Sequence, residues 1–182
     1  MGKKEFDEFI KTQSTYETDL NKETELNEWR NYLDQLYTNI DSWLLDYKEK
    51  GVVKITQRGK TIYEEFSGEY DVNEMIISLY GKTIVFEPIG TMFIGAKGRV
   101  DVHGKNGTVS LCLVNQDRVE PNISVKVFTS DKERILFENH VKSNQSKPVI
   151  WEWKIQLVDE KIRYIKLDED NFFDILLELT NG

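Results

Sequence analysis

The side chains best able to do chemistry lie in a short glycine-rich segment, residues 90–112. Within it, Arg99, Asp101 and His103 alternate with Val100 and Val102. This alternation is typical of a strand with one polar and one apolar face. A guanidinium, a carboxylate and an imidazole on one face could bind an anion or a small polar ligand. The same face could instead be a solvated surface on which the arginine and the aspartate form an ion pair.

The residues that follow predict a β-hairpin with its turn at 104–107. The expected register pairs three residues of each strand: His103 with Thr108, Asp101 with Ser110 and Arg99 with Cys112. Residues 82–105 carry a net charge of +2 in an acidic chain, which favours an anionic ligand here. The candidate ligand-binding residues are therefore Lys97, Arg99, Asp101, His103 and Ser110.

Several other sites are excluded by spacing. A phosphate-binding P-loop needs a lysine directly after its second glycine and then a helix, but Ala96 separates Gly95 from Lys97 and a strand follows. In the expected register Cys112 lies diagonally away from His103, too far for a nucleophile and its base. With one cysteine and two histidines, a zinc site of the usual type is not expected, and we predict no metal and no cofactor.

Composition and charge exclude further classes of function. The chain has 182 residues and a net charge of −8, so it is not expected to bind nucleic acid, whose phosphates repel acidic proteins. It has no stretch of about 18 apolar residues that would predict a membrane span. A single cysteine and the absence of a signal-peptide pattern favour the cytoplasm.

These features predict a non-enzymatic interaction module, such as an inhibitor, an immunity-like protein or an anti-defence protein, whose acidic surface meets a basic partner. One alternative is a small β-barrel that binds an anionic ligand at Arg99, Asp101 and His103. A second alternative is a hydrolase that uses Asp101 and His103 with Glu64 or Glu65, which would require these side chains to converge in one pocket.

Apolar residues separated by three and four positions predict a long helix over residues 22–50. They are Leu26, Trp29, Leu33, Leu36, Ile40, Trp43 and Tyr47. This stripe could pack on the chain's own sheet, giving a monomer, or on a second copy, giving a homodimer through 22–50. Residues 5–13 predict a short helix, and the polar residues 13–21 predict a loop.

After Gly51 the period becomes two, which predicts strands joined by short turns. The expected strands are 52–57, 60–67, 73–79, 83–87, 91–94, 99–103, 108–114, 123–129, 133–137, 149–158 and 161–165. Asp168 then begins a short C-terminal helix. The fold is expected to be α+β, a highly curved antiparallel sheet or barrel-like meander with both helices packed on it. Segment 1–51 would pack on a β domain at 52–182, forming one globular unit.

Trp151 and Trp153 alternate with Glu152 and Lys154 in a strand that has one apolar face. Tryptophan is enriched where proteins bind one another, so these two residues are candidates for partner binding. The same pattern fits a strand that faces the core.

Overall fold

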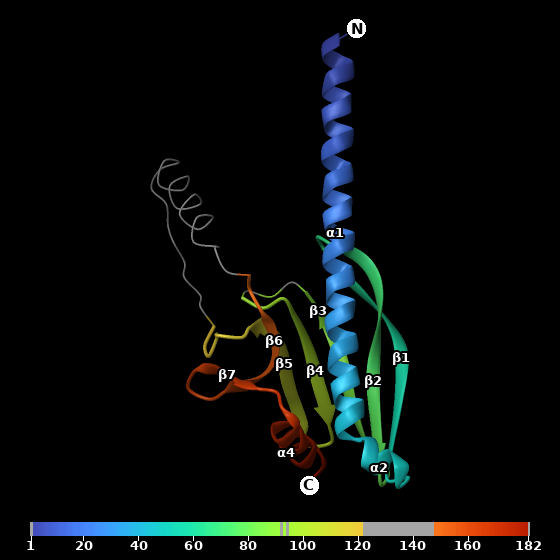
Figure 1. Cartoon of the computed structure of the whole chain (residues 1–182), viewed down its shortest axis with the longest axis vertical. Coiled ribbons are helices and arrows are strands. Elements are labelled where there is room, and N and C mark those ends of the chain that lie inside the picture. Colours follow the sequence, from blue (N-terminus) through green and yellow to red (C-terminus); the bar gives the residue numbers. More distant parts are fainter. Residues whose placement is uncertain (1, 92, 94, 122–147, 182) are drawn as a thin grey trace.

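The computed structural model describes residues 2–91, 93, 95–121 and 148–181. Seven antiparallel strands form one sheet in the order β1-β2-β3-β4-β5-β6-β7, with a long helix lying across it and a short helix at one end (Figure 1). The elements are α1 (Gly2–Trp43), α2 (Leu45–Glu49), β1 (Val53–Glu64), β2 (Gly68–Leu79), β3 (Lys82–Gly90), β4 (Gly98–Gly104), β5 (Gly107–Asn115), β6 (Trp151–Val158), β7 (Ile162–Lys166) and α4 (Glu169–Thr180). The α+β prediction is confirmed, but the sheet is open and does not close into a barrel.

The core lies between α1 and the sheet. Trp29, Leu33, Leu36 and Ile40 are buried together with apolar residues from β2 to β6. The indole nitrogen of Trp153 donates a hydrogen bond to the carbonyl of Tyr32, at 3.0 Å, and so fastens β6 to the helix. Most of the apolar stripe predicted for residues 22–50 thus packs on the chain's own core, whereas Tyr47 at its end is 42% exposed.

The loop predicted at 13–21 is wrong, because α1 is continuous from Gly2 to Trp43. No glycine or proline interrupts the chain between Gly2 and Gly51, so the backbone has no local reason to leave the helix. Threonine hydroxyls in this part donate to the carbonyl four residues earlier, as Thr12 does to Glu8. The helix also ends earlier than predicted, and residues 45–49 form the separate helix α2.

The turn predicted at Arg58 and Gly59 is also wrong. These residues pair with Glu74 and Asn73 inside β1, which runs unbroken from Val53 to Glu64. The chain reverses instead at residues 65–67, and Gly68 follows with a φ of 76°. Glycine adopts this left-handed conformation without the steric cost that other residues meet. Gly68 uses that freedom, whereas Gly59 does not have a positive φ and lies within the strand.

The remaining strand predictions are confirmed in outline where the structure describes them, except at 91–94, where Thr91 lies in a bend and Phe93 forms only an isolated bridge with Ala96. The register of β4 and β5 is the one expected from the sequence, and Asp168 caps α4 by accepting a hydrogen bond from the backbone of Asn171. Pro88 does not end its strand, because β3 continues to Gly90 with a register shift between the two. The strands predicted at 123–129 and 133–137, and part of 91–94, fall outside the described residues.

Candidate functional site

Arg99 and Asp101 form the centre of the polar face predicted on β4. The Nε and Nη2 atoms of the arginine donate to the two carboxylate oxygens, at 2.7 and 2.8 Å. Ser110, on the neighbouring strand, donates to the same carboxylate at 2.8 Å. Asp101 is buried, so this bidentate pair satisfies a carboxylate that has little access to water.

His103 belongs to a second cluster on the same face. Its Nε2 lies 2.8 Å from a carboxylate oxygen of Glu87, and its Nδ1 lies 2.9 Å from the hydroxyl of Thr108. Lys60, on β1, donates to the other oxygen of Glu87 at 2.5 Å and to the carbonyl of Pro88 at 3.0 Å. No local pattern links Lys60 with Glu87, because the two residues lie 27 positions apart on β1 and β3, the two strands that flank β2.

The predicted ligand-binding residues therefore fall into separate groups. Three of them, Arg99, Asp101 and Ser110, form one group, and His103 lies in the Glu87 cluster. Lys97 is directed elsewhere, since its ammonium pairs with Glu28 of α1 and lies 5.5 Å from the ring centre of Trp151. Lys60, Lys97 and Arg99 each have a carboxylate partner, which weakens their attraction for an added anion.

The groups that a hydrolase would need also have separate partners. Glu64 accepts hydrogen bonds from the hydroxyl of Tyr70 at 2.6 Å and from the backbone of Thr91 at 2.7 Å. Asp101 is held by its arginine and serine, and His103 by Glu87 and Thr108. Among the described residues, no group of three or more His, Cys, Asp or Glu side chains could hold a metal ion.

Cys112 is an ordinary buried thiol. Its Sγ donates to the side-chain oxygen of Gln156 at 3.1 Å, and burial raises its pKa to about 11. A thiol with so high a pKa remains protonated near neutral pH and is a poor nucleophile.

The two tryptophans proposed for partner binding lie on the helix-facing side of β6. Trp153 is buried, with its ring centre 5.9 Å from that of Trp29. Trp151 is partly buried and packs against the same core. This placement gives both residues a structural role in the core.

The Glu87 cluster predicts how stability depends on pH. The hydrogen bond from Lys60, and then that from His103, lower the pKa of Glu87. A carboxylate whose pKa is lowered by folding stabilises the protein above its unfolded pKa of about 4.3, and this contribution is lost as the pH falls through the folded value. We expect Glu87→Gln to cost about 1 kcal/mol at pH 7, since the cluster is partly exposed. Urea titrations of both proteins between pH 7 and pH 3 should show the difference shrinking below about pH 4. A difference that stays constant to pH 3 would contradict this account.

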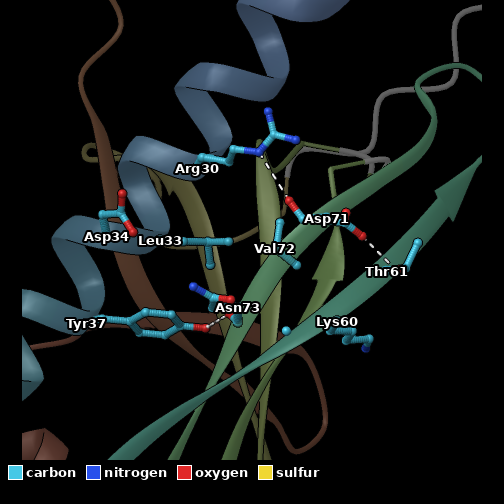
Figure 2. A pocket seen from close by; sticks show the side chains of 10 residues that line it. Arg30, Leu33, Asp34, Tyr37, Lys60, Thr61, Asp71, Val72 and Asn73 are labelled. Atoms are coloured by element: carbon cyan, nitrogen blue, oxygen red, sulfur yellow. Dashed lines mark hydrogen bonds between the residues drawn. The ribbon is translucent and has the colours of Figure 1, made fainter.

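A groove of about 510 Å³ separates α1 from the β1–β2 hairpin. Figure 2 shows Arg30, Leu33 and Tyr37 reaching from the helix toward β2, whereas Lys60 points away from the helix. The groove's polar groups are largely used within the chain, because Arg30 donates to the carbonyl of Asp71 and Tyr37 donates to that of Asn73. The groove is open and holds no cluster of unpaired charges that would select a ligand.

The clearest exposed apolar surface is on the first part of α1, residues 2–21, which we call the helical arm. It projects beyond the sheet (Figure 1), and the first buried residue of α1 is Trp29. Four large apolar side chains on the arm are at least half exposed: Phe6 (61%), Phe9 (56%), Ile10 (50%) and Leu20 (51%).

The exposed stripe of the arm lies on the opposite side of α1 from the stripe that faces the sheet. Leu20 and Trp29 are nine residues apart, which is two and a half turns at about 3.6 residues per turn. The apolar side of the helix therefore changes between these two residues. In the sequence, this surface is indicated only by Phe6, Phe9 and Ile10, which are spaced as neighbours on one side of a helix. These three residues are not in line with the apolar stripe of residues 22–50.

Within the described part of the chain, no helix is both long enough and apolar enough to span a membrane. Comparison of the chain with known protein families, curated proteins and solved structures finds no match.

Proposed function

We propose that this protein is a non-enzymatic interaction module that binds a protein partner through its helical arm. The observation that carries the proposal is the exposed apolar stripe of Phe6, Phe9, Ile10 and Leu20 on a helix that projects from the sheet. Large side chains of this kind, grouped on one side of a helix, are typical of binding surfaces.

The energetics of the arm support a binding role. An arm of 20 residues is about 30 Å long, and a helix gains most of its stability in proteins from packing an apolar face. The apolar face of the arm packs on nothing in the described part of the chain, since all its described side chains are exposed. Burying that face against a partner would remove apolar area from water and stabilise the helix at the same time.

The anchors also fit a known mode of recognition. Phe6, Phe9 and Ile10 stand at positions i, i+3 and i+4, the spacing by which an amphipathic helix fills a hydrophobic groove. The arm carries three lysines and five acids, a net charge of −2, and Glu5 lies one turn before Phe9. The complementary partner has an apolar groove with a basic rim.

Photo-crosslinking in the cells that produce the protein would test this proposal. A photoreactive phenylalanine analogue replaces Phe9 in one full-length variant and Lys11 in a matched control. Both positions are exposed, but they face opposite sides of the helix. We expect position 9 to give a discrete protein adduct. The yield of that adduct from position 11 should be at least tenfold lower. Equal, diffuse labelling from both positions would overturn the proposal.

A further inference from the structure

We infer that the partner groove is supplied by a second copy of this chain, so that the helical arm of one copy docks into an apolar pocket at the opposite end of the next. This inference rests on the proposed function and names its partner. The pocket, which we call the base pocket, has a volume of about 370 Å³ and lies between α2, the β2–β3 turn and α4.

The base pocket is lined almost entirely by apolar side chains, and several of them are open to solvent. Its lining includes Leu44, Val52, Ile77, Leu79, Phe173 and Leu176. Around the mouth, Tyr80 is 82% exposed, Leu177 55% and Tyr47 42%. Together with the helical arm, the base pocket makes two unpartnered apolar surfaces on one small protein.

Tyr80 has an unusual backbone conformation at the mouth of the base pocket. Its φ is 46°, and it is the only non-glycine residue with a positive φ in the described part of the chain. An aromatic residue is disfavoured in this conformation, which glycine or asparagine would adopt readily. Because the ring is so exposed, contacts within the chain do little to compensate for the strain. Residues 80 and 81 form a two-residue turn between the paired residues Leu79 and Lys82, and such a turn requires a positive φ at both positions. Tyrosine fills this position at a steric cost, and its exposed ring lies at the mouth of the base pocket.

Two lysines lie beside the base pocket. Lys50 lies 5.9 Å from the ring centre of Tyr47, and Lys82 donates to the carbonyl of Thr180, so both lysines border the base pocket. The helical arm has a net charge of −2. An apolar pocket with lysines at its edge is the groove that the acidic arm was expected to require.

The positions of the two surfaces decide the type of assembly. The helical arm extends from one end of the molecule, whereas α2 and α4 lie at the other end (Figure 1). One copy therefore binds the pocket of a second copy through its arm, and its own pocket can bind the arm of a third copy. Such a head-to-tail contact is heterologous, and it grows into chains or rings rather than stopping at a symmetric dimer. Pairing two arms with each other is less favourable, because antiparallel helices centred on Gln13 would place Asp7 opposite Asp19 of the other copy.

Sedimentation velocity with two complementary variants would test the inference. The arm variant, Phe6→Asp with Phe9→Asp, keeps the pocket intact, and the pocket variant, Tyr80→Asp with Leu177→Asp, keeps the arm intact. All four side chains are exposed, so the fold should be retained, and circular dichroism checks that it is. Tyr63→Asp, at a residue 78% exposed outside both surfaces, is the matched control.

We expect the wild type and the Tyr63→Asp control to form species larger than a dimer as concentration rises, and high salt to weaken them. Each interface variant alone should be monomeric. An equimolar mixture of the two should form a dimer and nothing larger, because only one arm and one pocket remain functional. A monomeric wild type at every concentration, or no complex in the mixture, would overturn the inference.

The crosslinking experiment separates this inference from the proposed function. An adduct of Phe9 to a different protein, with a monomeric wild type, would contradict the head-to-tail contact and retain the interaction module. An adduct to residues of the base pocket in a second copy would support both.

Discussion

Replacing Gly98 by alanine should lower the free energy of unfolding by about 3 kcal/mol, at the upper end of the range for overpacking a core. A Cβ atom at this position would overlap the ring of Trp29, with 2.6 Å to Cε3 and 2.8 Å to Cη2. Trp29 is fully buried and packs on Trp153, so it has no free space into which it could move. Urea denaturation followed by tryptophan fluorescence would measure the loss.

Gly59→Ala provides the matched control for this prediction. Gly59 also lies in a strand, but a Cβ atom there would meet nothing within 4 Å. Because alanine is favoured over glycine within a strand, the control should be neutral or stabilise the protein by up to about 1 kcal/mol. Equal effects of the two substitutions would show that Gly98 is not required for the close approach of Trp29.

The contrast between these glycines shows what the sequence could reveal. Five glycines in residues 90–112 correctly indicated sharp turns and close contacts, but not which glycine served which purpose. Gly107 has a φ of 147° at the β4–β5 turn, whereas Gly98 allows the helix to approach the sheet. A close approach depends on a residue about 70 positions away, and no local pattern contains that information.

Local sequence patterns gave correct predictions where the structure depends on neighbouring residues. The register of β4 and β5 followed from the turn between them, and the cap at Asp168 followed from the acids that begin α4. They failed for residues 13–21, where a polar composition suggested a loop although no helix-breaking residue was present. The same distinction holds for the polar face. Arg99 and Asp101 are neighbours on one strand and were predicted together, whereas Lys60 and Glu87 lie 27 residues apart on different strands.

The base pocket was not predicted for a related reason. Its lining comes from α2, β2 and α4, which are far apart in the chain, and each contributes apolar residues that fit a core equally well. Tyr80 precedes Gly81 in a turn that the sequence did predict, yet its exposure and its backbone conformation are properties of the folded chain.

The second large effect is expected at Asp101. Asp101→Asn should lower the free energy of unfolding by about 2–3 kcal/mol, because hydrogen bonds to charged groups are the stronger ones. An asparagine presents an NH2 group where the carboxylate accepts from Arg99 and Ser110, so at least one of these donors loses its acceptor. Arg99 is then left partly buried without a counter-charge, which adds to the cost.

Two further variants identify the origin of this loss. Ser110→Ala removes one neutral donor and should cost about 1 kcal/mol. Combining Asp101→Asn with Arg99→Met should cost less than the sum of the single substitutions, because the second change removes the unpaired charge that the first creates. Chemical denaturation of the wild type, Asp101→Asn, Arg99→Met and the double variant completes the double-mutant cycle. Strict additivity would show that Arg99 and Asp101 do not stabilise each other, and their ion pair would then lose its role in holding the polar face of β4 together.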